Sequence, residues 1–192
     1  GEIIWITPKD ISTQNNKYIR YGERSITKEG LSSCSASIVP KGSVLMSSRA
    51  PIGLLSIAEI DLCTNQGFKN FIPDKDKIES EYLYYYLKTK IDDINKLGSG
   101  TTFKEVSKTS IENFEILIPN NISDQSRISK VLSSLDSKIA LNNRINAELE
   151  AMAKTVYDYW FVQFDFPNAE GKPYKSNGGK MVWSEELKRE IP

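Results

Sequence analysis

The chain has 192 residues, of which 39% are hydrophobic, and its 25 basic side chains balance its 25 acidic ones; this length suits one globular domain with an extension. The same balance holds on each side of Asn120, which excludes a broadly basic nucleic-acid-binding domain and leaves only a local arrangement of charges for binding DNA. The absence of histidine excludes Ser-His and Cys-His nucleophile arrangements and the usual zinc sites.

Short apolar runs separated by Gly and Pro fill the first part of the chain. Strands are expected at residues 1–6, 37–39, 43–47 and 54–60, with a last one ending at Ile72. Such short and closely punctuated strands predict a curled, mostly antiparallel sheet.

Helical spacing of apolar residues begins after this sheet. A helix is predicted over residues 79–96, ending before Gly98, because one face carries Leu83, Leu87, Ile91 and Ile94. Residues 105–113 are expected to add one or two helical turns, and residues 114–118 a strand closed by Pro119. Together with the sheet, these helices predict an α+β globular domain over residues 1–119.

One long helix is predicted from Ser123, a suitable N-cap, to Phe161. No Pro or Gly interrupts it, and its length would be about 58 Å. Its apolar residues follow the seven-residue repeat of a seam that packs against another helix: Ile128, Leu132, Leu135, Ile139, Leu149, Met152, Val156 and Trp160. A helix of this length cannot bury such a seam against a domain of this size, so part of it requires another partner.

The middle of this seam is polar, because Asn142, Asn143 and Asn146 stand where Leu would be expected. Buried Asn in a seam fixes the register and the number of partners, whereas a solvated face would need no such explanation. The two interpretations remain open at this point. Either way, residues 120–162 are predicted to form a coiled-coil spacer and docking helix rather than a catalytic element.

The remaining residues, 163–192, are polar and Gly-rich, and residues 184–188 are expected to form a short helix. Cys34 and Cys63 lack metal-ligand spacing, and the chain shows neither a signal peptide nor a long apolar run. These features predict a reduced cytoplasmic protein without a membrane association.

A Gly-rich loop, three adjacent tyrosines and the acidic residues are further candidates for a functional role. The loop from Gly98 to Lys104 lacks the Gly-Lys-Ser/Thr ending of a nucleotide P-loop, so it either contacts a DNA phosphate or simply ends the preceding helix. Adjacent tyrosines at 84, 85 and 86 could stack on bases, but helical spacing favours a core position for Tyr86 and an amphipathic surface position for the other two. Acidic residues show no nuclease-like spacing, apart from Asp136-Ser137-Lys138 on the long helix, and the chain has no Asn/Asp-Pro-Pro-aromatic segment of the kind adenine methyltransferases use.

Seven segments, taken in order, resemble the DNA-specificity subunit of type I restriction-modification systems. Each segment alone is weak evidence, but their order is specific and together they cover nearly the whole chain. The segments are Trp5–Ile11, Gly42–Gly53, Thr64–Phe68, Gly98–Thr102, Ile118–Pro119, Asp124–Ile128, and the stretch from Trp160 to Trp183 that includes Gly171–Tyr174 and Gly178–Trp183.

This resemblance implies a target-recognition domain followed by a helical spacer. Members of the family usually hold two such halves in tandem, with the two spacer helices packed antiparallel and each recognition domain reading one half of a split DNA target. The resemblance also implies a subunit without catalysis or a cofactor of its own. Its partners would be two methyltransferase subunits and, in the full complex, the ATP-driven motor-nuclease subunits.

The chain departs from the family's pattern in two ways. It holds one half rather than two, and it starts inside the recognition domain, without the strand and loop that usually precede the Trp5–Ile11 segment. Its last residues, 186–192, resemble the lead-in to a next repeat. We therefore expect either a half-subunit or a fragment of a longer chain.

The leading hypothesis is a DNA sequence-recognition module that pairs with a second copy through its long helix. A two-fold dimer would restore two recognition lobes and read an interrupted, palindromic target. The alternative is a coiled-coil docking protein without a DNA role, which the neutral charge balance favours. A nuclease is a third hypothesis, supported only by scattered carboxylates.

Candidate DNA contacts lie on loops at the ends of the predicted strands, which would enter the major groove. Arg49 is expected to contact guanine, and Asn65 or Gln66 to read adenine unless these two side chains brace a turn. Backbone phosphates would be positioned by hydroxyl side chains and attracted by lysines: Ser47, Ser48, Thr101 and Thr102, with Lys9, Lys41, Lys69 and Lys104.

Overall fold

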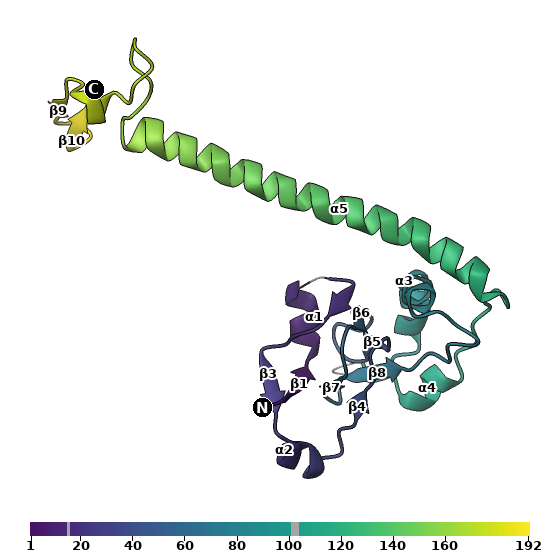
Figure 1. The fold of residues 1–192 in the computed structure, drawn as a ribbon. Coiled ribbons are helices and arrows are strands. Elements are labelled where there is room, and N and C mark those ends of the chain that lie inside the picture. Colours follow the sequence, from purple (N-terminus) through teal and green to yellow (C-terminus); the bar gives the residue numbers. More distant parts are fainter. Residues whose placement is uncertain (15, 101–103) are drawn as a thin grey trace. The chain divides into compact units, whose positions relative to one another are not determined.

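The computed structural model describes the chain except residue 15 and residues 101–103. It divides into two compact units, residues 1–133 and residues 134–192. The first unit holds both four-stranded sheets and the shorter helices, and the long helix α5 (Ile122–Tyr157) begins in it and runs on into the second (Figure 1). The first turns of α5 therefore belong with the globular part of the chain.

The first sheet has the strand order β3-β1-β7-β4, built from Arg24–Ile26, Ile3–Ile6, Leu62–Thr64 and Ile38–Val39. Strands β1 and β7 are parallel, with Trp5 opposite Cys63, and the other two pairs are antiparallel. Two short helices, α1 (Pro8–Gln14) and α2 (Lys28–Ser32), lie in the connections between its strands.

The second sheet has the order β2-β6-β5-β8, built from Tyr18–Ile19, Leu55–Ala58, Val44–Ser47 and Phe68–Phe71. Here β2 and β6 are parallel, whereas β5 is antiparallel to both of its neighbours. The predicted α+β class is confirmed. The strands are mostly antiparallel as expected, but they form two mixed sheets because the chain moves repeatedly from one sheet to the other.

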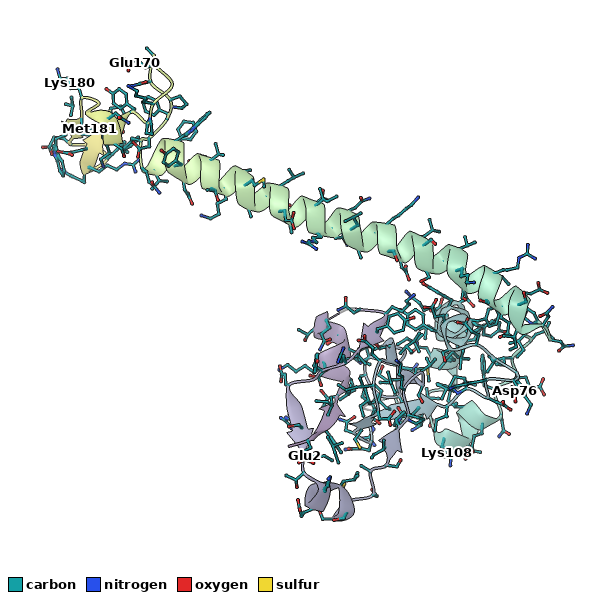
Figure 2. All side chains as sticks on the ribbon, viewed as in Figure 1. Glu2, Asp76, Lys108, Glu170, Lys180 and Met181 are labelled. Carbon is teal, nitrogen blue, oxygen red and sulfur yellow. The ribbon has the colours of Figure 1, made fainter. Side chains whose placement is uncertain are left out.

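Strand β5 is buried on both faces and separates two hydrophobic clusters. Val44 and Met46 pack with helix α3 (Ser80–Lys96), while Leu45 points into the other cluster with residues of β1 and β7. This alternation follows from the two-residue period of a strand. Figure 2 shows the side chains that fill the interior around these strands and α3.

Helix α3 confirms the predicted helix 79–96, and Glu79 caps it by accepting a 2.9 Å hydrogen bond from the Tyr82 amide. Tyr84 and Tyr85 are buried in the core, whereas Tyr86 is partly exposed. The expected division of these tyrosines between core and surface was therefore wrong. The buried face of α3 that carries Leu83 and Leu87 is wide enough to include Tyr84 and Tyr85 as well. The rings of these two tyrosines are therefore not available to stack on bases.

Two predicted elements are absent from the described residues. Residues 114–118 form no strand, because the Leu117 amide donates to the Tyr86 hydroxyl at 3.3 Å rather than to another strand. Residues 184–188 are not a helix but contain the turn of a hairpin between β9 (Val182–Ser184) and β10 (Arg189–Ile191). Within this turn the Leu187 amide donates to the Ser184 hydroxyl at 3.2 Å.

The long helix agrees with the prediction in extent. It is α-helical from Ile122 to Tyr157 and then continues as a π-helical turn, Asp158–Val162. Its N-cap is Asn121 rather than Ser123, because the Asn121 side chain accepts a 2.8 Å hydrogen bond from the Ser123 amide. The helix therefore begins slightly earlier than expected.

Residues 163–178 form a small folded segment in the second unit. The rings of Phe166 and Tyr174 stack with centroids 4.8 Å apart, and Asp165 accepts hydrogen bonds from the amide and hydroxyl of Ser176 at 2.7 and 2.6 Å. These hydrogen bonds lower the pKa of Asp165. A 3-10 turn, Lys175–Asn177, closes the segment.

A buried amide fixes the start of α5 in the first unit. Gln125 has no exposed surface, and its Nε2 donates to the carbonyls of Lys77 and Pro119 at 2.9 and 2.7 Å. Its Oε1 accepts a 2.9 Å hydrogen bond from the Glu79 amide. One turn further along, Ser129 donates to the Glu79 carboxylate at 2.9 Å. The face of α5 that meets the globular unit is therefore polar.

Replacing Gln125 should destabilise the first unit. We expect Gln125→Ala to lower the free energy of unfolding by about 1–3 kcal/mol, because it removes the hydrogen-bond partner of three backbone groups at a buried position. The measurement is urea unfolding followed by circular dichroism. Asn143→Ala, at an exposed position of the same helix, is the matched control and should change stability little; an equal loss in both variants would contradict the assignment.

Candidate nucleic-acid interface

The predicted contact Arg49 lies on a loop whose shape is set by the preceding strand. Strand β5 ends at Ser47, and the chain returns through residues 48–54 to β6. Two backbone hydrogen bonds of 2.9 Å, between Ser47 and Leu54 and between Gly53 and Ser47, close this loop. Gly53 has a φ of +91°, and a side chain there would lie 2.8 Å from Ile91 of α3, so the loop packs closely on that helix.

Ser47 and Ser48 hold the loop from inside. Both have no exposed surface. The Ser47 hydroxyl donates to the Pro51 carbonyl at 2.6 Å and accepts from the Leu54 amide at 2.9 Å. The Ser48 amide donates to the Gly67 carbonyl at 2.8 Å, and its carbonyl accepts from Val106 at 2.9 Å. The prediction that these two hydroxyls position DNA phosphates is corrected, because no phosphate can reach a fully buried hydroxyl.

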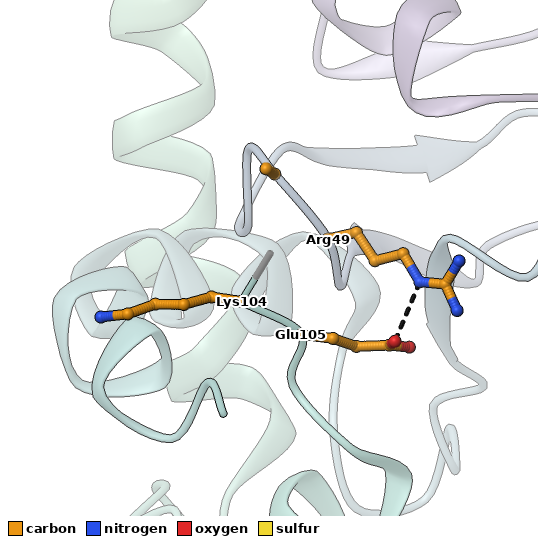
Figure 3. A pocket seen from close by; sticks show the side chains of 4 residues that line it. Arg49, Lys104 and Glu105 are labelled. Carbon is orange, nitrogen blue, oxygen red and sulfur yellow. Dashed lines mark ion pairs between the residues drawn. The ribbon is translucent and has the colours of Figure 1, made fainter. Parts of the chain in front are cut away.

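The Ser48 hydrogen bonds bring three distant segments together around Arg49. These are the loop after β5, the turn between β7 and β8, and the segment after α3. In that last segment, Ser99 and Glu105 are joined by two backbone hydrogen bonds of 2.9 and 3.0 Å. The Arg49 Nε lies 2.9 Å from a carboxylate oxygen of Glu105 (Figure 3). The Lys69 ammonium lies 3.6 Å from the same carboxylate. We call Arg49, Lys69, Lys104 and Glu105 the Arg49 cluster.

The Arg49 cluster is a small, locally basic hollow. A cavity of about 400 Å³ is lined by Arg49, Ala50, Lys104 and Glu105. Arg49 and Lys69 both lie within 3.6 Å of the Glu105 carboxylate, whereas the Lys104 side chain extends away from it (Figure 3). The cluster thus holds three cationic side chains and one carboxylate in a domain that is neutral overall.

The ion pair leaves the end of the Arg49 side chain accessible. Its side chain is 51% exposed, and the two terminal nitrogens of the guanidinium extend beyond the contact that Nε makes with Glu105 (Figure 3). A planar guanidinium held in this way can donate two parallel hydrogen bonds to the O6 and N7 atoms of a guanine. Sequence inspection missed Glu105, because its contact with Arg49 joins residues far apart in the chain.

The turn between β7 and β8 separates the roles of Asn65 and Gln66. The Asn65 side-chain oxygen accepts a 3.0 Å hydrogen bond from the Gly67 amide, so Asn65 braces the turn, as one of the two sequence interpretations allowed. Gln66 is exposed at the tip of the same turn. Because Gly67 is bonded to Ser48, Gln66 lies close to the loop that carries Arg49.

The predicted lysine contacts differ in their surroundings. Lys9, on α1, pairs with Glu23 at 2.8 Å, and the Lys41 amide, in the turn before β5, donates to Asp61 at 2.8 Å. Lys69 is mostly buried and Lys104 is exposed. Thr101 and Thr102 lie outside the described residues.

The corner beside Lys9 is organised by Asp10. Burial favours the neutral form of this carboxyl group, but hydrogen bonds from the Thr7 hydroxyl, at 2.6 Å, and from the Glu23 and Thr7 amides outweigh it and lower the pKa of Asp10. Asp10 also lines a cavity of about 250 Å³ with Thr13, Gln14, Tyr21, Gly22 and Glu23. Its oxygens are occupied by these internal hydrogen bonds, so we assign it a structural role.

The apolar seam of α5 is the second candidate interaction surface. Its members are each at least 36% exposed: Ile128, Leu132, Leu135, Ile139, Leu149, Met152, Val156 and Trp160. Asn142 and Asn146, in the middle of the seam, are exposed as well. Two exposed apolar stretches on one helix, joined by a short polar stretch, are typical of a surface that binds a partner.

The described part of the chain contains neither a membrane-spanning helix nor a cluster of metal ligands. Its helices include none with the length and apolar character needed to cross a lipid bilayer. The same residues contain no group of three or more acidic or cysteine side chains arranged to hold a metal ion.

Residues 1–151 match the family model of the type I restriction modification DNA specificity domain. The chain is 41% identical to the type I restriction enzyme MjaIX specificity subunit of Methanocaldococcus jannaschii, over all of this chain and 42% of that protein. It is 27% identical to the HindI specificity subunit of Haemophilus influenzae, over 85% of this chain and 36% of that protein. The chain thus spans less than half the length of these relatives.

Two solved structures are similar to this chain in fold. A chain from a study of complex assembly and conformational transition in a type I R-M system matches 80% of this chain and 36% of its own length, with 26% identity and a TM-score of 0.61. The HsdS subunit of Thermoanaerobacter tengcongensis matches 83% of this chain and 37% of its own length, with 22% identity and a TM-score of 0.57.

The internal role of Ser47 can be tested by its removal. We expect Ser47→Ala to lower the free energy of unfolding by about 1–3 kcal/mol, because the Pro51 carbonyl and the Leu54 amide lose their partner in a buried loop. Chemical unfolding measures the change, and Ser35→Ala, at an exposed position, is the control. Unchanged stability combined with weaker DNA binding would return Ser47 to the phosphate-contacting set.

Proposed function

This chain belongs to the type I restriction-modification DNA specificity family, and we propose on that premise that it is a DNA sequence-recognition module that does no chemistry itself. The observation that carries the proposal is the Arg49 cluster, in which Glu105 fixes a half-exposed guanidinium above a locally basic hollow. Base-specific contact requires an oriented donor rather than general positive charge. The neutral composition of the domain is therefore compatible with sequence reading.

Within this proposal the residues divide into two groups. Arg49 contacts a guanine edge, and Gln66, at the tip of the neighbouring turn, reads an adjacent base. Lys69 and Lys104 attract the phosphate backbone, as do Lys9 and Lys41, while the hydroxyls of Thr101 and Thr102 position phosphates. Asn65 supports the turn that presents Gln66.

The proposal also includes the partners of the long helix. Two copies of the chain pair antiparallel through the apolar seam and present two recognition lobes, so that the dimer reads both halves of a split, palindromic target. This assembly docks methyltransferase subunits and, in the full complex, motor-nuclease subunits. It acts in the cytoplasm, where the free thiols Cys34 and Cys63 would stay reduced.

A second candidate is a coiled-coil docking protein without a DNA role. The specific observation in its favour is the exposed seam, which requires a partner whether or not the domain binds DNA. The two candidates differ in what Arg49 does. A docking protein has no need of an oriented guanidinium in a basic hollow.

Changing Arg49 should alter specificity. We expect Arg49→Ala to relax the preference at one base pair of the target and to weaken binding to the cognate sequence by about 1–3 kcal/mol. The measurement is binding of the protein to a library of duplexes in which each target position is varied. A loss that is uniform across all sequences would reassign Arg49 to a phosphate contact.

Lys104→Ala supplies the contrasting case. We expect it to weaken binding to all sequences alike and to reduce the slope of log affinity against log salt by about one. Lys75→Ala removes an exposed lysine outside the Arg49 cluster and is the matched control for charge. Sequence-dependent loss in the Lys104 variant would contradict its assignment.

Methylation mapping tests the function as a whole. The chain is co-expressed with its methyltransferase subunit, and methylated adenines are mapped across the genome. A palindromic bipartite motif supports a specificity subunit assembled from two identical halves, whereas an asymmetric motif requires a second, different half. A soluble, co-purifying complex without methylation above background would favour the docking protein.

A further inference from the structure

The exposed face of α5 follows a regular seven-residue frame. In this frame the seam positions between Leu132 and Val156 are Leu132, Leu135, Ile139, Asn142, Asn146, Leu149, Ala153 and Val156, and all of them are exposed. Met152 lies beside the seam instead of in it, since the repeat requires alternating steps of three and four residues. Trp160 falls in the π-helical turn, where the α-helical frame no longer holds.

The pattern is symmetric about Arg144. When the helix is reversed about this residue, each seam position meets another seam position: Leu132 meets Val156, Leu135 meets Ala153, Ile139 meets Leu149, and Asn142 meets Asn146. This is the relation between two identical antiparallel helices, since their two-fold axis lies perpendicular to the helix direction. All apolar positions therefore face apolar positions, and the amides face amides.

The amides select one register among those that the heptad frame allows. A shift by one repeat in one direction places Asn142 against Ile139 and Asn146 against Leu135 of a second copy. A shift by one repeat in the other direction places Asn142 against Ala153 and Asn146 against Leu149. Each shift buries amides against hydrocarbon without hydrogen-bond partners, which is unfavourable. Only the register centred on Arg144 lets the amides pair.

One flank of the seam adds apolar surface on the same side of the helix. It carries Val131, Ile145, Met152 and Tyr159, which are exposed, and in an antiparallel pair this flank faces the same flank of the second copy. Ile145 then meets Ile145 of the second copy near the axis. On the opposite flank, Asp136 lies near Glu150 of the second copy. This contact between like charges is exposed to solvent, so it reduces the stability of the pair only slightly.

We propose that α5 pairs with α5 of a second copy in a single antiparallel register, centred on Arg144 and selected by a layer formed by Asn142 of one copy and Asn146 of the other. The inference rests on the proposed dimer and specifies which residues meet in it. The polar middle of the seam is then a device for choosing the partner and register, and is not a solvated interruption. A chain whose seam lacks amides at this level makes a poorer partner, because it leaves the amides of Asn142 and Asn146 unpaired.

Disulfide trapping tests the register. In a full chain that carries Cys34→Ser and Cys63→Ala, we compare three mixtures of singly substituted, differently tagged copies under mild oxidation. Ile139→Cys with Leu149→Cys reports the proposed register, Leu132→Cys with Leu149→Cys reports one shifted register, and Ile139→Cys with Val156→Cys reports the other. We expect the first pair to cross-link at least about tenfold more than either alternative, because each alternative leaves amides unpaired.

Asn142→Leu combined with Asn146→Leu tests the cause of the selection. Removing the amide layer should raise the thermal midpoint of the dimer, since buried Asn costs stability, and should abolish the preference among the three cross-linking pairs. Circular dichroism confirms that each variant is helical before oxidation. Retention of the preference without the amides would overturn the proposed role of Asn142 and Asn146.

The inference and the proposed function fail in different ways. Dominance of a shifted pair, with DNA recognition intact, overturns the register only. Absence of cross-linking in all three mixtures, together with a monomer by light scattering, overturns the pairing of identical copies. Cross-linking in the proposed register by a protein that shows no sequence preference for DNA leaves the register standing and overturns the proposed function.

Discussion

The buried amide of Gln125 fixes the first turns of the long helix to the globular unit. This one side chain bonds to the Glu79 amide and to the carbonyls of Lys77 and Pro119, so it joins the start of α3, the segment before α5 and the first turn of α5. All three partners are backbone groups, and a displacement of the helix by one residue would break every bond. Ser129 and Ser133 continue this polar face, Ser133 by accepting a 2.6 Å hydrogen bond from Lys17. The apolar seam lies on another face, about a quarter of a turn away, and stays available to a partner.

Local periodicity explains which elements could be predicted from the sequence. Helices α3 and α5 and strand β5 carry their own repeats of apolar residues, and their extents agree closely with the expectations. The segment from Phe114 to Ile118 has a strand-like composition, but its Leu117 amide is satisfied by the Tyr86 hydroxyl, a distant partner that no local pattern records. The hairpin of β9 and β10 was missed because a charged run resembles a short helix when its pairing is unknown.

At the candidate site, too, local sequence patterns could be interpreted, whereas contacts between distant segments could not. The loop with Arg49 could be located from its Pro and Gly residues and from the family's motif order, but the direction of its hydroxyl groups could not. Strand β5 is buried on both faces, so Ser47 and Ser48 at its end inherit buried positions. The Ser47 hydroxyl bonds within the loop, and the Ser48 hydroxyl accepts a 3.4 Å hydrogen bond from the Lys69 ammonium. Glu105 became part of the site only through the backbone pairing of Ser99 with Glu105 and the contact between Ser48 and Val106. These are tertiary constraints that residue type alone does not encode.

Glu105 also bears on how a neutral domain can recognise DNA. In the proposed recognition of DNA, a carboxylate beside Arg49 and Lys69 reduces the general attraction to phosphates, which is the sequence-independent part of binding. It also fixes the direction of the guanidinium, which is proposed to supply the sequence-dependent part. A single lobe that works in this way would gain selectivity at the expense of affinity. In the proposed dimer the second lobe binds as an intramolecular event, and its effective concentration restores the affinity without adding charge. The helix register then matters for recognition, because it sets the distance between the two lobes and hence the spacing of the two half-targets that can be bound together.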